Sequence, residues 1–209
     1  ADARLLQEAG CDLLFAPDVA EMYPAGFSTK VRVEGVSAPL CGATRPGHFD
    51  GVAQVVTKLL NQAQAEFAVF GEKDWQQLAV IRRLARDLDI DTAVVGAPTV
   101  READGLAMSS RNRYLTETER AAAPALFAAL TRAAARIAEG EDVANALAEG
   151  RAAVTAAGFQ QPDYFEARDA EALDLIEQFD PSRPVRVFAA ARLGRARLID
   201  NVPVPVASG

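Results

Sequence analysis

The stretch Phe67–Val100 reads FAVFGEKDWQQLAVIRRLARDLDIDTAVVGAPTV and carries the strongest fold signal in the chain. Its two ends, Phe67–Gly71 and Thr92–Val100, are short apolar runs bounded by glycine or proline, which is typical of buried strands. Between them, apolar residues recur at helical spacing over Leu78–Leu88. A strand, a helix and a second strand in this order predict two parallel strands joined by a crossover helix.

Further elements are predicted before this stretch. Cys11–Pro17 is a compact apolar run that predicts a buried strand, and Thr29–Gly35 alternates in period two, which predicts a half-exposed strand. A helix is expected from Gly51 onward. The first nine residues resemble the end of a helix that stops at Gly10. No basic segment leads into an apolar stretch, so no signal peptide is expected. Because the sequence opens within a helical pattern, we expect that an N-terminal portion precedes Ala1.

The pattern changes after Arg101. It predicts two helices, over Glu117–Glu139 and Asp142–Ala157. Three strands are predicted after them, over Asp163–Arg168, Val185–Arg192 and Ala196–Asn201. Gly194, between the last two strands, indicates a hairpin. The chain is therefore predicted to be an α/β protein, with a parallel-sheet domain over residues 1–100 and a smaller α+β domain over residues 101–209.

Composition excludes several classes of function. Of 209 residues, 50% are hydrophobic and 24% are charged, as in an ordinary globular protein, and the net charge of -7 disfavours a general nucleic-acid-binding face. No window approaches the roughly 18 consecutive apolar residues of a membrane span. The alanine-rich run Ala121–Ala138 contains proline and arginine and is expected to be a soluble helix. The only two cysteines, Cys11 and Cys41, do not have the spacing of metal ligands. Two cysteines make no disulfide framework, which indicates a reduced cytosolic protein.

The first motif that could carry chemistry is FGEKDWQQ, Phe70–Gln77. The N-terminus of a helix that follows a strand offers free backbone N–H groups to a phosphate, Gly71 allows close approach, and Lys73 adds a mobile positive charge. Ligands of open α/β sheets bind beyond the carboxyl ends of the strands, where this turn would lie. The alternative is an ordinary strand–helix turn in which Lys73 is merely solvated.

A second motif, GATRPGHFDGV (Gly42–Val52), holds the chain's single histidine, His48. A lone histidine is more often structural or exposed than functional, but Arg45 and the nearby glycines make this one a candidate. With one histidine and no nucleophile signature, the sequence contains no Ser-His-Asp or Cys-His set.

The third motif is PTVREADGLAMSSRNRYL, Pro98–Leu115. It also leaves the carboxyl end of a strand, and its serine hydroxyls together with Arg111 could clamp phosphate oxygens. The alternative is that Ser109 or Thr116 caps the following helix. Thr116 followed by Glu119 matches a capping box, so we assign that role to Thr116. Ser109, Ser110 and Arg111 are left without a structural explanation.

In this order and spacing, the three motifs resemble those of the pantoate–β-alanine ligases (pantothenate synthetases). That family lies within the nucleotidyltransferase superfamily with H-I-G-H and K-M-S-K-S type motifs. EMYPAGF (Glu21–Phe27) and the tail AAARLGRARLIDN (Ala189–Asn201) also match, so the resemblance covers essentially the whole chain. It implies the later part of a Rossmann-like nucleotide-binding domain over residues 1–100. Residues 101–209 would form a smaller α+β lid domain with the phosphate-clamping loop.

The resemblance also implies an activity and a set of site residues. Pantoate and Mg-ATP would form pantoyl adenylate and pyrophosphate, and β-alanine would then attack to give pantothenate and AMP. The implied catalytic residues are Lys73, Ser109, Ser110 and Arg111. The implied ATP-binding residues are Gly71, Glu72, Lys73, Asp74, Val100, Met108, Ser109, Ser110 and Arg111. Gln77 would bind pantoate, and His48 would lie near the substrate pocket without an assigned role. Ala107 stands where the K-M-S-K-S pattern has its first lysine, so Arg111 would be the loop's main cation.

The family's catalytic histidines and a second pantoate-binding glutamine would precede Ala1. The resemblance further implies ATP as a substrate, Mg²⁺, no dedicated protein metal site, small-molecule partners only, a cytoplasmic location and a homodimer. Two alternatives stay open: a non-catalytic nucleotide-binding fragment, and another nucleotidyltransferase of the same superfamily.

Overall fold

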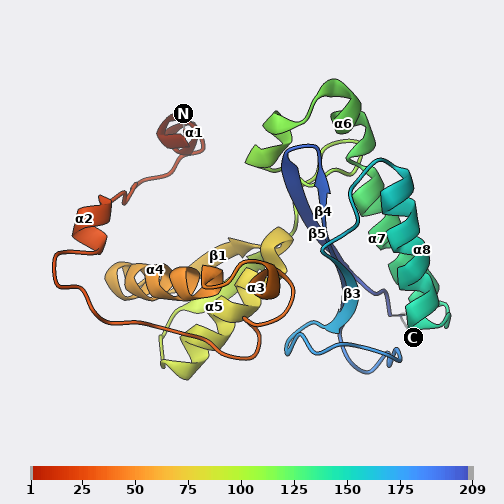
Figure 1. Ribbon diagram of the computed structural model, residues 1–209. Coiled ribbons are helices and arrows are strands. Elements are labelled where there is room, and N and C mark those ends of the chain that lie inside the picture. The colour runs from red at the N-terminus through yellow and green to blue at the C-terminus, as the bar shows by residue number, and fades with distance from the viewer. Residues whose placement is uncertain (1, 207–209) are drawn as a thin grey trace. The chain divides into compact units, whose positions relative to one another are not determined.

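The computed structural model describes residues 2–206 (Figure 1). The chain forms two compact units, one that ends at Val31 and one that begins at Arg32. The first unit contains two helices, α1 (Asp2–Glu8) and α2 (Val19–Met22). Helix α1 ends just before Gly10, whose φ of 78° confirms the predicted glycine stop. The second unit contains the strands and the remaining helices.

Two predicted strands do not form. Residues 11–17 are irregular, with Leu13 82% and Phe15 56% exposed. Residues 29–35 are also irregular. Both predictions were wrong because a strand is stabilised by a paired neighbour, and neither segment pairs with another strand within residues 2–206. An apolar or alternating pattern shows which side chains of a strand would be buried, but it does not show which other strand would pair with it.

The stretch Phe67–Val100 forms the predicted strands and helix, but the prediction that the strands are buried was wrong, because Phe67 is 58% and Val69 65% exposed. In chain order this part holds α3 (Cys41–Thr44), α4 (His48–Ala63), β1 (Phe67–Gly71), the 3₁₀ turn η1 (Glu72–Asp74), α5 (Trp75–Asp87) and β2 (Ala93–Ala97). Strands β1 and β2 are parallel, with Phe67 opposite Ala93 and Gly71 opposite Ala97. Helix α5 packs against α4 and β2. The predicted crossover unit is therefore confirmed, except that a 3₁₀ turn precedes the helix.

The C-terminal part is antiparallel. It contains η2 (Ser110–Tyr114), α6 (Glu117–Ala122), α7 (Ala125–Ala138), α8 (Val143–Ala156), β3 (Tyr164–Asp169), β4 (Val185–Leu193) and β5 (Ala196–Pro203). The strand order is β3-β4-β5, with Phe188 opposite Glu166 on one side and Asn201 on the other. Only Gly194 and Arg195 connect β4 to β5, and Gly194 has a φ of 54°. This confirms the predicted hairpin.

The first predicted helix of this part is interrupted. Pro124 has no backbone N–H and stands at the start of α7, which separates α7 from α6. By length and hydropathy alone, Glu117–Ala138 could cross a membrane. In the structure, however, Leu126, Leu130 and Ile137 of α7 are almost completely buried in the core. The apolar face of α7 thus belongs to the protein interior.

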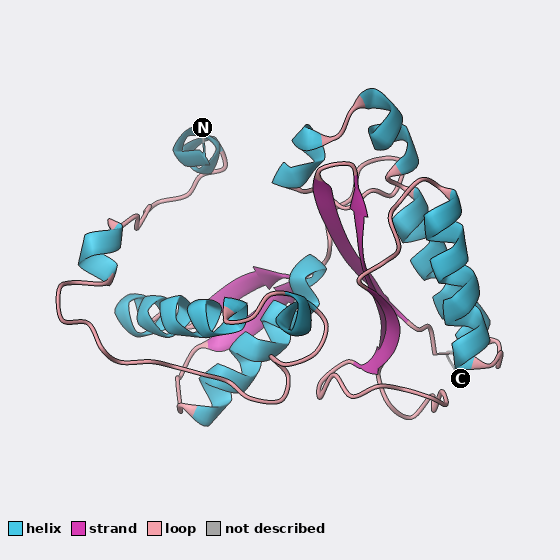
Figure 2. Ribbon diagram, viewed as in Figure 1, coloured by secondary structure: helices cyan, strands magenta, loops and turns pink. Residues whose placement is uncertain are grey.

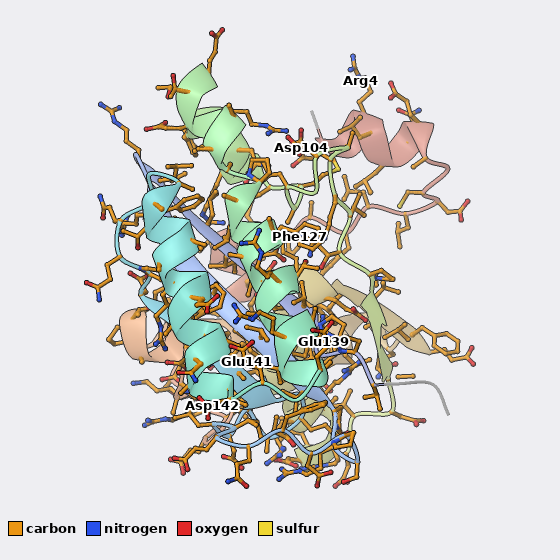
Figure 3. All side chains as sticks on the ribbon, turned by 90° about the vertical axis from the view of Figure 1, so that its right-hand side faces the viewer. Arg4, Asp104, Phe127, Glu139, Glu141 and Asp142 are labelled. Carbon is orange, nitrogen blue, oxygen red and sulfur yellow. The ribbon has the colours of Figure 1, made fainter. Side chains whose placement is uncertain are left out.

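Helices α7 and α8 lie side by side against the three-stranded sheet, and the main core fills the space between them (Figure 1, Figure 2). Phe165 and Val187 of the sheet are fully buried there. Glu139, Glu141 and Asp142 gather where α7 passes into α8 (Figure 3). Asp142 caps α8 by accepting the Asn145 N–H at 2.9 Å. This packed layer supports the strands β4 and β5.

Candidate active site

The main cavity of the second unit has a volume of about 720 Å³, a size suited to a small-molecule ligand. It lies between the start of α4, the η1 turn, the loop before α6 and the β4–β5 hairpin. The predicted site residues that line it are His48, Lys73, Asp74, Gln77, Ser109 and Arg111. Segments from three separate motifs therefore meet at one cavity.

The other predicted residues lie close to these in sequence but outside the cavity lining. Gly71 ends β1, and Glu72 lines a neighbouring cavity of about 400 Å³. Val100 and Met108 are joined by a backbone hydrogen bond of 2.9 Å from the Met108 N–H, and both side chains are exposed. Ser110 is exposed at the start of η2. Their roles in nucleotide binding stay predictions.

The turn after β1 presents two charged side chains to the cavity. Lys73 is mostly buried, with its side chain 16% exposed, and its Nζ lies 3.8 Å from an oxygen of Asp74. Gln77 lies four residues after Lys73, in the first turn of α5, and both residues line the same cavity. An ammonium group held this way, beside the N-terminus of a 13-residue helix, suits an anionic ligand.

His48 is the first residue of α4 and is held by Arg45. The Arg45 Nη1 donates to His48 Nε2 at 3.0 Å, and because a guanidinium has no acceptor, Nε2 must be unprotonated. Burial and the positive charge of Arg45 lower the pKa of His48, while Asp74 opposes them. The ring is therefore a neutral imidazole at pH 7, with Nδ1 carrying its proton.

The loop Pro98–Leu115, which is predicted to clamp phosphate, is anchored in its first half. An antiparallel bridge joins Arg101 to Ala107, and Gly105 turns between them with a φ of 91°. A side chain at Gly105 would collide with the ring of Phe127, which Figure 3 labels on α7. Arg101 forms two hydrogen bonds with the Asp200 carboxylate, at 2.6 and 2.9 Å. The loop is thereby fixed to β5.

The second half of the loop combines capping contacts with polar groups that have no partner. Ser109 accepts the Arg111 N–H at 3.2 Å and so caps η2, while Thr116 and Glu119 form the predicted capping box. The alternative role considered for Ser109 is thus partly correct. Within residues 2–206, the Arg111 guanidinium has no hydrogen-bond or ion-pair partner, and the buried Asn112 Oδ1 is unsatisfied. Both border the cavity.

The β4–β5 hairpin supplies residues that sequence reasoning missed. Arg192, Arg195 and Arg197 all line the cavity. Arg197 donates to Asp163 at 2.7 Å, to the Thr44 hydroxyl at 3.1 Å and to the Cys41 sulfur at 3.3 Å. The basic run around Gly194 was the available signal, but nothing in it showed which cavity the hairpin would face.

The chain matches proteins of known function. A family model for pantoate-beta-alanine ligase matches residues 1–203. The chain belongs to the pantoate–β-alanine ligase family. It is 57% identical over 203 residues to a pantothenate synthetase of Sphingopyxis alaskensis, covering 97% of this chain and 72% of the relative. It is 59% identical over 203 residues to the pantothenate synthetase of Paramagnetospirillum magneticum, and this match covers 97% of this chain and 71% of the relative.

Solved structures of this ligase family share the fold. The Thermus thermophilus enzyme superposes with a TM-score of 0.91 at 50% identity, covering 97% of this chain and 73% of that one. The Francisella tularensis ligase, described as complexed with beta-gamma ATP and beta-alanine, has a TM-score of 0.75 at 30% identity. That match covers 97% of this chain and 68% of the other. The family resemblance drawn from the motifs is therefore confirmed.

The single histidine of this ligase chain permits a direct titration. We expect the ring of His48 to titrate below its ordinary value of about 6.5. Because the folded state then binds fewer protons than the unfolded state, stability should fall as pH drops below that value. Proton NMR of the imidazole gives the midpoint. Asp74→Asn should lower it further, since the Asp74 charge raises it; a midpoint at or above 6.5 would contradict the geometry.

Proposed function

We propose that this cavity joins pantoate to ATP and then to β-alanine. The activity is that of the family, the formation of a C–N bond between pantoate and β-alanine in pantothenate biosynthesis. The observation that carries the assignment of the site is the convergence of Lys73, Gln77 and Arg111 on one cavity in a chain of this family.

In the first step, adenylation of pantoate, negative charge develops on the leaving pyrophosphate near Lys73 and Arg111. A carboxylate oxygen of pantoate attacks the α-phosphorus of ATP, the bond to the β-phosphate bridging oxygen breaks, and pyrophosphate leaves with the electron pair. Lys73 and Arg111 stabilise the negative charge that develops on the leaving group, and Ser109 and Ser110 donate hydrogen bonds to phosphate oxygens. Gly71, Glu72, Asp74, Val100 and Met108 complete the proposed ATP site.

In the second step, the neutral amine of β-alanine attacks the acyl carbon of pantoyl adenylate. The acyl–oxygen bond to AMP breaks, a proton leaves the new amide nitrogen, and pantothenate and AMP are released. Closure of the loop over the phosphates would exclude water, which would otherwise hydrolyse the adenylate. His48, neutral and at the cavity wall, is placed near the reacting groups without an assigned step.

Mg²⁺ enters this scheme as the counterion that accompanies ATP. Within residues 2–206, no group of three or more His, Cys, Asp or Glu side chains is placed to hold a metal ion. Magnesium commonly keeps several waters and binds substrate phosphates with only one or two carboxylates. The described residues therefore fit an ion carried by the nucleotide rather than a protein cage.

Several features of the family resemblance remain part of the proposal. We propose that β1 and β2 belong to a Rossmann-like nucleotide-binding domain with a boundary near residue 100. We also propose that the part from residue 101 acts as a lid, and that the protein is a cytoplasmic homodimer. The parallel β1–β2 pair and the anchored loop support the first two points.

Gln77→Ala should separate the two proposed subsites. Gln77 lies about one helical turn beyond Lys73, and we propose that its amide reaches past the phosphates toward pantoate. We expect about a tenfold loss of pantoate affinity, the size of one lost hydrogen bond to a charged group. ATP affinity should stay within about twofold, because no phosphate contact is removed. Calorimetry with each ligand measures both, and a selective fall in ATP affinity would contradict this placement.

Product analysis tests the proposed function. With ATP, pantoate and β-alanine together, mass spectrometry should detect pantothenate and AMP in equal amounts, and omission of any substrate should abolish both. Formation of ADP in place of AMP would contradict the adenylate route. Binding of ATP without any product would favour the alternative of a non-catalytic nucleotide-binding protein.

A further inference from the structure

Asn201 connects the C-terminal sheet to the turn that presents Lys73. It lies on β5 and is almost completely buried, with 2% of its surface exposed. Its Nδ2 donates to the backbone carbonyls of Glu72 and Lys73, both at 3.0 Å. These residues are 129 and 128 positions away in the sequence. One amide group therefore holds two successive peptide units of η1.

The orientation of this amide is fixed by its third contact. Arg186 Nε donates to Asn201 Oδ1 at 2.7 Å. A guanidinium can only donate, so the oxygen of Asn201 must face Arg186 and the nitrogen must face the two carbonyls. Both N–H donors and one lone pair of the oxygen are thus used, and a flipped amide would lose all three bonds.

Arg186 is itself firmly placed beneath the same turn. Its guanidinium stacks 3.8 Å from the centre of the Trp75 ring, and the Trp75 indole N–H donates to the Ala170 carbonyl at 2.7 Å. Burial lowers the pKa of Arg186 to about 10, while the charges of Glu72 and Asp200 favour its protonated form. Arg186 stays charged at neutral pH and holds the Asn201 oxygen in place.

We propose that Asn201 is a positioning residue for Lys73. By fixing the carbonyls of Glu72 and Lys73, it sets the backbone direction from which the Lys73 side chain enters the cavity. This inference rests on the proposed function of Lys73 as a phosphate-binding cation. A small displacement of a group that contacts the reacting phosphates has a large effect on rate, because catalysis depends on its position. Asn201 itself does not line the cavity, so it would contribute to the proposed nucleotide site through the η1 turn.

A double-mutant cycle with Lys73 tests this proposal. Asn201→Asp keeps the size of the side chain and the oxygen facing Arg186 but removes both N–H donors. We expect it to slow pantoate-dependent ATP–pyrophosphate exchange about tenfold in kcat, and less than about twofold when Lys73→Ala is already present. Asn201→Leu, which removes the donors without adding charge, should behave in the same way.

Val187→Ala is the matched control, because Val187 is fully buried in the core of the same sheet and is paired with Val202 rather than with the turn. Any effect of that variant should be equal with and without Lys73. Equal effects of the Asn201 variants in both backgrounds, or unchanged exchange, would overturn the proposal.

A second readout separates this inference from the proposed function. A protein without pantoate-dependent exchange would contradict the proposed function, but amide hydrogen exchange would still test the positioning. Asn201→Asp should speed exchange of the Trp75–Gln77 amides by about tenfold or more, and leave the amides of α7 unchanged. Unchanged protection of the turn would overturn the inference whatever the activity.

Discussion

Lys73→Ala is expected to slow formation of pantoyl adenylate by about 10²-fold or more, as the loss of a preorganised donor to a developing charge does. The Lys73 ammonium is mostly shielded from water at the cavity wall, with Asp74 as its nearby carboxylate. In such surroundings a positive charge acts strongly on phosphate oxygens, and water replaces it poorly. Single-turnover measurement of the adenylation step gives the effect.

Arg86→Ala is the control for this substitution. Arg86 is a cation near the C-terminal end of α5, the helix that follows the Lys73 turn, and it pairs with Asp87 on the surface. Its removal should leave the adenylation rate within about twofold, because exposed charges are screened by water and salt. A near-normal rate for Lys73→Ala would remove Lys73 from the catalytic site.

Arg101→Ala is expected to lower the free energy of unfolding by about 3 kcal/mol, since it leaves a buried carboxylate without its partner. The Asp200 side chain is only 4% exposed and the Arg101 side chain 19%. Arg101 also stacks 3.8 Å from the Phe127 ring centre and donates to the Gly105 carbonyl at 3.1 Å. Urea denaturation measures the loss.

The same Arg86→Ala variant serves as the stability control. The Arg86–Asp87 pair is exposed on both sides, so its loss should cost between about 0 and 1 kcal/mol. A cost for Arg101→Ala within that range would show that the Asp200 carboxylate regains water or another partner. In that case, the loop would not depend on β5 for its position.

Local sequence patterns predicted the elements whose signals are local. The run Phe67–Val100 gave both strands and the helix, and the short turn at Gly194 gave the hairpin. The capping box at Thr116 was also predicted, because its contacts span only three residues. Cys11–Pro17 failed, since the run has the composition of a strand but no partner strand within residues 2–206.

The sequence predicted those residues of the candidate site that belong to its motifs. Lys73, Gln77 and Arg111 line one cavity, as their placement at neighbouring strand ends indicated. The roles of Asn201 and Arg197 could not be predicted, because Asn201 reaches a carbonyl 129 residues away and Arg197 reaches the Cys41 sulfur 156 residues away. A contact between a buried amide and a distant carbonyl leaves no periodic pattern in the chain.

ATP–pyrophosphate exchange, with and without pantoate and in the absence of β-alanine, tests the central claim most directly. The account predicts that labelled pyrophosphate enters ATP only when pantoate is present, because the reverse of adenylation needs the pantoyl adenylate. It also predicts that Lys73→Ala depresses this exchange by about 10²-fold, since the same charged transition state is crossed in both directions. Exchange that proceeds without pantoate, or none from a folded protein at saturating substrates, would contradict it.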